Sequence, residues 1–584
     1  MHISVVATDF DGTISDDDQL APAAAQALRR WRQAGQVTVL VSGRPFEFLQ
    51  ALQERVQAFD LIVAENGAVL YNPRTDEMRL PFGQVPEELL DTLASMGVPL
   101  WRGIAAAGTT AAYDDAVWVT SRELGLAVHV ETNRNEVMLL PPGASKGAGL
   151  VTLLQGEGLS ARNLLAFGDA ENDQSLLQVA EVKVAVANAV EGLQAMADYV
   201  APEPGPAGVV SFLECYLLDG RPFDFPVRGA HHFDLDAAGE IKLNAYDLVD
   251  REILIAGGSG CRKSWLACHL ADGLISGGYQ LLGLDPVGDL CVLRRHSSCL
   301  SFGREHVPAT SLIVQLLAET DLSLVVDLSR LPTPEERVLY ATGLLRRVLE
   351  MRRRLGKPHW ILIDEAQDLL GGHVNPSHLP LLESFESFGV CLVAWRPSCL
   401  DRAVLDRIHG FVLTRHRLGS EVECLSRLLA DRGLDTSGLP QQLKQLGEGQ
   451  ALTWGLTPDP ADALLRVRFG AGPRIFPGMR RLHRYLEGGV SPSKRFYFHD
   501  SKGNIAPAGS LVELVDRLRS LDLSVIAYHL QRGDFGRWIR DVLHDETLAR
   551  WVDRLQSVDL SGEALRFALL DTLEQRRRVL GRLL

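Results

Sequence analysis

Short apolar runs alternate with longer amphipathic stretches in two blocks of this sequence, and that rhythm restricts the chain to α/β architecture. In the first block, runs such as "HISVVATDF" and "LLAFGD" end in small or acidic residues. The second block begins near residue 240 with "REILIAGG" and continues through "QLLGLDPVGD", "LSLVVDLS", "HWILIDEAQD" and "VCLVAWRPS". Each block predicts a mostly parallel sheet with helices on both faces.

A proline- and glycine-rich segment, residues 201–208, interrupts the rhythm between the blocks. We therefore predict one α/β domain over residues 1–220 and a second over residues 221–480. Residues 481–584 predict a small mixed domain with a mostly helical end, of unknown type. A chain of 584 residues exceeds what one hydrophobic core usually serves, which agrees with this multidomain division.

The composition predicts a globular protein of the cytoplasm. Hydrophobic residues make up 46% of the chain, enough for sizeable cores, and the formal net charge of -15 disfavours general binding to nucleic acid or anionic membrane. The eight cysteines form no CxxC pair, so a reducing compartment is expected. The chain opens in an apolar strand without signal-peptide features and contains no apolar run of about 18 residues, so no membrane partner is expected.

Two aspartates in "ATDFDGT" stand two residues apart at the end of the first apolar run. Alternation along a strand places Asp9 and Asp11 on the same side, and the glycine that follows permits a tight turn. In this arrangement one carboxylate can attack phosphorus while the other handles a proton. A strand end capped by acidic turn residues is the alternative that this motif alone leaves open.

Three later segments supply the other groups that a phosphoryl-transfer site needs. Ser42 follows the apolar run in "VLVSGRP", and Lys146 stands in "PPGASKG". A hydroxyl and a cation at these places can bind phosphoryl oxygens. "LLAFGDAENDQSLL" adds Asp169, Asn172 and Asp173 after a third run. Oxygen ligands beside a phosphate are the donors that Mg2+ prefers, so Mg2+ is the expected cofactor.

The order DxDGT, SGR, K and GDxxND resembles the haloacid dehalogenase (HAD) superfamily, in particular its Cof-like, subclass IIB phosphatases, over about residues 1–215. The resemblance implies a Rossmann-like core and hydrolysis of a small phosphate monoester, either a sugar phosphate or a phosphorylated acid. It also implies a small α+β cap over about residues 83–140. Arg134 of this cap could meet a substrate carboxylate, although a solvated loop arginine is the more common case.

The same resemblance implies a role for each matched residue. Asp9 would be the nucleophile that forms an aspartyl-phosphate, and Asp11 would be the general acid and then the general base. The remaining matched residues would bind the phosphoryl group, namely Ser42, Lys146 and Asn172, or the metal, namely Asp169 and Asp173 together with Asp9 and the backbone carbonyl of Asp11.

The second block opens with "GGSGCRKSW", which has the shape of a phosphate-binding loop between a strand and a helix. Such a loop wraps phosphate in backbone N–H groups, while its lysine reaches the phosphates and its Ser/Thr binds Mg2+. Gly257, Gly260, Lys263 and Ser264 occupy four of the expected places. Arg262 occupies the place of a glycine whose conformation is costly for other residues, so we expect a weak nucleotide site.

Asp364 and Glu365 end the apolar run "HWILIDEAQD" about a hundred residues later, where they are suited to bind Mg2+ and to orient a water. With the order of the other runs, they make residues 225–470 similar to the HerA/FtsK-type P-loop ATPases. That resemblance implies ATP as a second ligand and a ring-shaped homo-oligomer. Trp395 stands where that family commonly has a phosphate-sensing glutamine, so slow ATP hydrolysis is expected.

The sequence leaves two functional interpretations open. The first is a Mg2+-dependent phosphatase of a small phosphorylated metabolite with an attached, altered nucleotide-binding domain. The second is a nucleotide-dependent translocase or a DNA-associated assembly protein with an accessory phosphatase, which could act on nucleic-acid ends. Arginines interleaved with aromatics in the last hundred residues fit DNA contact, but they fit a small core with a basic rim better.

Overall fold

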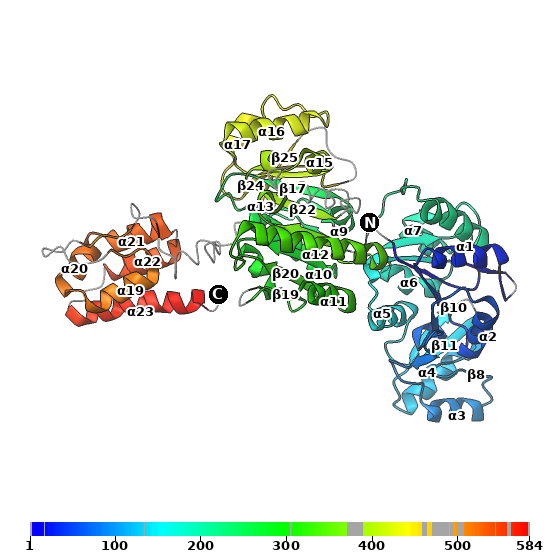
Figure 1. The fold of residues 1–584 in the computed structure, drawn as a ribbon. Helices are drawn as coiled ribbons and strands as arrows, with labels where there is room; N and C mark the ends of the chain where they lie inside the picture. Colours follow the sequence, from blue (N-terminus) through cyan, green and yellow to red (C-terminus); the bar gives the residue numbers. More distant parts are fainter. Residues whose placement is uncertain are drawn as a thin grey trace.

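The computed structural model of this protein contains two large α/β units and a smaller helical unit (Figure 1). The residues that it describes are 3–16, 18–133, 135–229, 231–303, 306–370, 389–457, 464–469, 490, 495–498, 507–543, 545–556 and 562–581. Arg134, the cap arginine considered above, lies outside them.

The described part of the first α/β unit is built on an eight-stranded sheet in the order β14-β13-β12-β1-β4-β5-β6-β7. The strands are β1 (Val5–Thr8), β4 (Val37–Val41), β5 (Leu61–Ala64), β6 (Val69–Asn72), β7 (Glu77–Arg79), β12 (Leu164–Gly168), β13 (Val182–Ala185) and β14 (Tyr199–Val200). Pairing is parallel from β14 to β5 and antiparallel beyond it. Because β1 lies between β4 and β12, the residues that follow these three strands meet at one edge.

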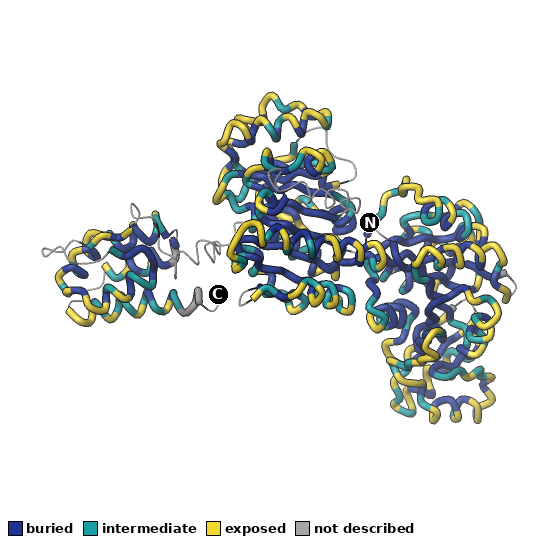
Figure 2. Tube along the Cα trace, viewed as in Figure 1, coloured by how far each residue is buried: buried dark blue, intermediate teal, exposed yellow. Residues whose placement is uncertain are grey.

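Helices cover both faces of this sheet, which confirms the predicted α/β core. One face packs against α1 (Pro22–Gln33), α2 (Phe46–Val56) and α8 (Gly205–Phe212). The other face packs against α5 (Lys146–Gly156), α6 (Gln174–Val179) and α7 (Glu191–Met196). The central strands are buried on both faces, which is why they appear in the sequence as continuous apolar runs (Figure 2).

A smaller α+β layer is inserted between β7 and α5, where the sequence places a cap. It has an antiparallel sheet in the order β10-β11-β9-β8 and two helices. The elements are α3 (Glu87–Ser95), β8 (Trp101–Arg102), β9 (Ala107–Thr110), α4 (Asp114–Glu123), β10 (His129–Asn133) and β11 (Glu136–Leu140). Leu89, Leu93 and Val117 of the helices pack on Leu139 of the sheet, so this layer has a core of its own.

The second α/β unit has a sheet in the order β19-β20-β18-β21-β22-β17-β23-β24-β25. The strands are β17 (Glu252–Ala256), β18 (Leu281–Asp285), β19 (Cys299–Phe302), β20 (Ser323–Asp327), β21 (Trp360–Ile363), β22 (Val390–Ala394), β23 (Gly410–Leu413), β24 (Gln450–Trp454) and β25 (Leu465–Arg468). The helices α10 (Lys263–Ser276), α11 (Thr310–Glu319), α12 (Pro334–Leu355) and α16 (Gly419–Ala430) cover it. The first strand of this sheet in chain order, β17, is again internal.

The two α/β units contact each other at the edges where their strands begin. Asn163, directly before β12, donates to the Gly356 carbonyl at 3.2 Å and lies 3.0 Å from His359 Nε2, directly before β21. Tyr279, two residues before β18, donates its hydroxyl hydrogen to Glu181, directly before β13, at 2.5 Å. Among these residues Asn163, Tyr279, Glu181 and His359 are all buried.

The helical unit near the carboxyl end consists of α19 (Leu511–Ser520), α20 (Leu523–Gln531), α21 (Asp534–Trp538), α22 (Glu546–Leu555) and α23 (Gly562–Gly581). Its core includes Leu514, Ile526, Phe535 and Leu569. Within the described ranges, no helix combines the length and the apolar character needed to cross a bilayer.

Candidate active site

The first acidic motif lies where the central strand β1 ends and the chain turns. The Asp9 side chain is buried, and the Thr8 hydroxyl donates to the Asp9 backbone carbonyl at 2.8 Å. Asp11 is more accessible, with 47% of its side chain exposed. Gly12 adopts φ +79°, and a Cβ there would lie 2.4 Å from an Asp169 carboxylate oxygen. This turn therefore requires glycine, and it brings the motif against Asp169.

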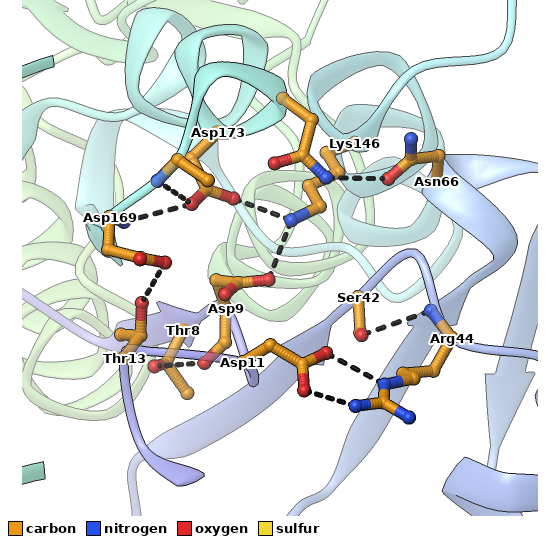
Figure 3. Close-up of polar contacts among 12 residues, drawn as sticks. Thr8, Asp9, Asp11, Thr13, Ser42, Arg44, Asn66, Lys146, Asp169 and Asp173 are labelled. Atoms are coloured by element: carbon orange, nitrogen blue, oxygen red, sulfur yellow. Dashed lines mark hydrogen bonds and ion pairs between the residues drawn. The ribbon is translucent and has the colours of Figure 1, made fainter. Parts of the chain in front are cut away.

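Lys146, the first residue of α5, connects two of the acidic motifs (Figure 3). Its Nζ donates to Asp9 Oδ1 and to Asp173 Oδ1, both at 2.6 Å, and all three side chains are buried. Burial and the charge of Asp173 raise the pKa of Asp9 to about 8, against the opposing effect of Lys146. Burial lowers the pKa of Lys146, but attraction to Asp173 and Asp9 outweighs burial and leaves it above the ordinary value.

Asp9, Asp169 and Asp173 form a buried cluster in which one carboxylate oxygen of each lies within 4.8 Å of the others. Thr13 donates its hydroxyl hydrogen to Asp169 Oδ1 at 3.3 Å, and the Asp169 backbone N–H donates to Asp173 Oδ2 at 2.9 Å. One ammonium group faces three carboxyl groups, and the charges of Asp173 and Asp169 add to the effect of burial in raising the pKa of Asp9. An all-oxygen cluster of this charge fits a hard divalent cation such as Mg2+.

Ser42 and Asn172 approach the cluster from the ends of two other segments. Ser42 is buried directly after β4, and its hydroxyl oxygen accepts the Arg44 backbone N–H at 3.2 Å. Asn172 Nδ2 donates to Asn66 Oδ1 at 3.3 Å, and the Asn66 backbone N–H donates to the Ser42 carbonyl at 3.1 Å. The structure thus brings every residue predicted for the phosphatase site to the carboxyl edge of one sheet.

Arg44 is a site residue that the sequence reasoning missed. Its Nε and Nη2 donate to the two Asp11 oxygens at 2.9 Å and 2.6 Å, and Nη2 also pairs with Asp18. The hydrogen bonds that Arg44 donates to Asp11 raise the pKa of Arg44 above its ordinary value. The signal was present in "VSGRP", because this arginine stands two residues after the predicted serine. In this conformation the arginine holds the side chain that was predicted to handle the proton.

Glu65, in the turn after β5, connects the sheet to the cap. Its carboxylate accepts the backbone N–H groups of Ile104 at 2.9 Å and of Ala105 and Ala106 at 2.8 Å. Glu65 and Asn66 both have positive φ, 52° and 51°. Sequence reasoning missed this anchor because its partners lie 39 to 41 residues away in the chain.

The second predicted site also lies at the carboxyl edge of its sheet. Lys263 begins α10 and donates to the Gly258 carbonyl at 3.3 Å. Ser264 donates its hydroxyl hydrogen to Asp364 at 3.1 Å, and burial raises the pKa of Asp364 to about 7. Gly260, with φ +76°, precedes Lys263 in the same loop. Gly257 follows β17, and Glu365 directly follows Asp364 and accepts from Gln367 at 2.7 Å.

Arg262 has φ +63° and ψ 28°, the left-handed conformation that the sequence argument expected of this position. Its guanidinium pairs with Glu448, which comes from the segment before β24, at 2.8 Å. A non-glycine residue in this conformation costs about 1–2 kcal/mol. The pair with Glu448 offsets part of that cost and draws the arginine side chain toward Glu448.

Comparison with known proteins identifies the first unit. The family described as "haloacid dehalogenase-like hydrolase" matches residues 6–97 and 120–213. A phosphoglycolate phosphatase from Methanoculleus marisnigri is 33% identical over 226 residues, which cover 37% of this chain and 97% of that relative. A phosphoglycolate phosphatase from Saccharolobus solfataricus is 28% identical, covering 36% and 92%, and a pyridoxal phosphate phosphatase from Escherichia coli is 24% identical, covering 37% and 100%. The chain therefore belongs to the haloacid dehalogenase-like hydrolase family, and its first α/β unit is a phosphoric monoester hydrolase.

Proposed function

We propose that this protein is a Mg2+-dependent phosphatase that hydrolyses a small phosphate monoester through an aspartyl-phosphate. The observation that carries the proposal is the bridge from Lys146 to Asp9 and Asp173, because it places a cation and two carboxylates where a phosphoryl group and a metal would meet. The relatives named above act on small phosphorylated metabolites, as their names state. The proposed substrate is a metabolite of that kind.

In the proposed reaction the Asp9 carboxylate attacks phosphorus, and the bond to the leaving alcohol breaks. Asp11 protonates that alcohol and then removes a proton from the water that hydrolyses the aspartyl-phosphate. Ser42 and Lys146 bind the phosphoryl oxygens, and Asn172 lies beside them. Asp9, Asp169, Asp173 and the Asp11 carbonyl would hold Mg2+, which supplies positive charge to the phosphoryl oxygens when bound.

The Arg44–Asp11 pair adds a step to this scheme. Both oxygens of the Asp11 carboxylate accept guanidinium N–H groups, so Asp11 must separate from Arg44 before it can contact the leaving oxygen. A substrate phosphate that reaches the site can compete for the arginine. We propose that substrate binding frees Asp11 in this way.

The test is turnover of an aryl phosphate by the full-length protein with Mg2+. Asp9→Asn removes the charged nucleophile in a side chain of the same shape, so kcat should fall by roughly a thousandfold or more. EDTA should abolish turnover, and excess Mg2+ should restore it. Asp91→Asn, which changes an exposed cap aspartate, is the control and should match the natural protein. Undiminished turnover by the Asp9 variant would contradict the proposed nucleophile.

A second candidate function is nucleotide binding by the second α/β unit. We propose residues 221–480 as the bounds of that unit. Lys263 and Ser264 at the start of α10, with Asp364 beside Ser264, favour a Mg2+-bound triphosphate such as ATP. The resemblance to ring-forming HerA/FtsK-type ATPases extends the proposal to a homo-oligomer. DNA is the partner of the less favoured interpretation. The other two proposed domains are residues 1–220, which contain the phosphatase site, and residues 481–584.

Titration with a fluorescent ATP analogue tests this candidate. Arg262→Gly removes a side chain from the loop that would wrap the phosphates, so we expect the analogue to bind roughly five- to tenfold more tightly, whereas relief of the left-handed strain stabilises the free and the bound protein alike. Lys263→Ala should weaken binding, and Glu448→Gln separates the effect of the ion pair from that of the backbone. If Arg262→Gly binds the analogue more weakly than the natural protein, the arginine contributes to the site.

A further inference from the structure

Glu131 is the cap carboxyl group that reaches the phosphatase core. It lies on β10, opposite Met138 of β11, and the Asn66 amide donates to Glu131 Oε2 at 3.0 Å and contacts Met138 Sδ at 3.1 Å. β10 packs against the turn that contains Asn172 and Asp173. Burial raises the pKa of Glu131, while the charge of Lys146 opposes that effect. The Glu131 carboxylate is therefore close enough to Lys146 for the two charges to attract each other.

The hydrogen bonds of this region fix the orientation of two amides. An ionised carboxylate only accepts, so Asn66 must direct its NH2 group to Glu131 and its oxygen to Asn172. Asn172 must then direct its own NH2 group to Asn66. The Asn172 Oδ1 atom that remains is buried and makes no hydrogen bond within the described structure. Glu131 and Asn172, the two ends of this row of three hydrogen-bonded side chains, thus both present acceptor oxygens.

This row of acceptors lies next to the phosphoryl-binding residues. The Asn66 backbone N–H binds the Ser42 carbonyl, and Asn172 directly precedes Asp173, which binds Lys146. The alcohol part of an ester bound at Asp9 would extend from the phosphate toward the cap. There it would approach the Glu131 carboxylate, which accepts from Asn66 and can accept further hydrogen bonds, and the Asn172 carbonyl oxygen, which has no donor among the described residues.

We propose that Glu131 selects esters whose alcohol part carries a hydroxyl or ammonium donor and rejects esters that carry a carboxylate; this inference rests on the proposed phosphatase function. A buried acceptor without a donor is costly, and a substrate carboxylate beside Glu131 adds like-charge repulsion. Of the two substrate kinds that the sequence implies, the structure thus favours the sugar-like kind. This proposed preference differs from the substrate named for the phosphoglycolate phosphatases that the chain resembles.

The experiment compares 2-phosphoglycolate, glycerol phosphate, phosphoethanolamine and an aryl phosphate on the full-length protein. We expect kcat/KM for at least one donor-bearing ester to exceed that for phosphoglycolate by about tenfold or more. Glycerol phosphate against phosphoethanolamine distinguishes hydroxyl from ammonium recognition. Glu131→Gln should raise the ratio of kcat/KM for phosphoglycolate to kcat/KM for the aryl phosphate by about tenfold, mainly through the KM of phosphoglycolate.

Two further variants keep the test decisive. Glu131→Asp retains the charge and should still reject phosphoglycolate, while Glu123→Gln, at an exposed place on α4, removes one cap charge elsewhere and should change nothing. The inhibition constant of phosphoglycolate against aryl phosphate turnover reports the same selection when phosphoglycolate is not hydrolysed. A natural protein that prefers phosphoglycolate, or an unchanged preference in Glu131→Gln with intact aryl turnover, overturns the inference. Absence of aryl turnover in the natural protein overturns the proposed function, and the inference with it.

Discussion

The Asp9 carboxylate is disfavoured by burial and by repulsion from two neighbouring carboxylates, and a bound cation would relieve that repulsion. Its carboxyl group is buried beside Asp173 and Asp169, and Lys146 compensates for one negative charge. The raised pKa means that the metal-free protein keeps a proton on Asp9 near neutral pH. A bound divalent ion would replace that proton and leave the carboxylate ready to attack.

This gives a prediction for the pH dependence of metal binding. The pKa of Asp9 is raised from 3.8 to about 8, so below pH 8 Mg2+ must displace a proton, and above pH 8 it need not. The apparent Mg2+ affinity should therefore rise with pH by up to about tenfold per unit and level off above pH 8. Calorimetry in buffers of different ionisation enthalpy should detect protons released on binding at pH 7. Asp9→Asn is the control, and an affinity that stays constant between pH 6 and 8 would contradict the assignment.

At the scale of elements, the Glu65 carboxylate adds an attachment between the core and the cap to the two connecting segments and the contact of Asn66 with Glu131. Glu65 binds three successive N–H groups of residues 104–106 and the Phe46 N–H at 3.3 Å. Two residues with positive φ place this carboxylate where it can do so. The start of β9 is thereby fixed against the turn that also carries Asn66.

Glu65→Ala should loosen that attachment. Leaving the buried N–H groups without an acceptor costs about 3 kcal/mol, so exchange of the amide hydrogens of residues 104–106 should become about a hundredfold faster. Hydrogen-exchange mass spectrometry measures this directly. Glu54→Ala, an exposed glutamate of α2, is the matched control. Unchanged exchange in this segment of the Glu65 variant would show that the cap is held by other contacts.

The parallel strands explain which part of the phosphatase site could be predicted from the sequence. Asp9, Ser42 and Asp169 each follow an apolar run, and parallel pairing of β4, β1 and β12 brings such positions together, so periodicity and turn residues were sufficient. The family and the α/β core were confirmed for the same reason. Glu131 acts across a boundary between two layers, and a single sequence contains no signal for a contact formed by packing. The roles of the site residues stay predictions.

At the scale of the whole molecule, residues beyond 220 belong to the packing of the phosphatase core. Phe223 and Phe225 stack at 4.9 Å and contact Tyr216, Phe212 and Tyr199. The buried contacts of Asn163 with His359 and of Glu181 with Tyr279 add a second attachment between the units. Sequence reasoning missed both contacts, because it placed the boundary from the proline- and glycine-rich segment 201–208 and the strand rhythm, and neither signal reports packing between distant residues.

Two fragments test how the first unit ends. A fragment of residues 1–229 retains the aromatic cluster, whereas residues 1–220 lack Phe223 and Phe225. The loss of two packed aromatic side chains costs about 3 kcal/mol, so the shorter fragment should melt roughly 6–12 °C lower. Both should retain aryl phosphatase activity, because all the predicted site residues lie within them. Equal melting temperatures would contradict the packing argument, and insolubility of both would show that the contact with the second unit is needed for folding.

The meeting of the two sheets at the edges where their strands begin has a kinetic consequence. Asp169 follows β12 and Asp364 follows β21, so the two sites open in directions away from the shared contact. One strand of five residues and one of four lie between them, and at about 3.3 Å per residue these strands measure roughly 17 Å and 13 Å along their own axes. If the two proposed sites share a compound, we therefore expect that compound to pass through the surrounding solution. An unlabelled pool of it in solution would then dilute an isotope label passing between the sites.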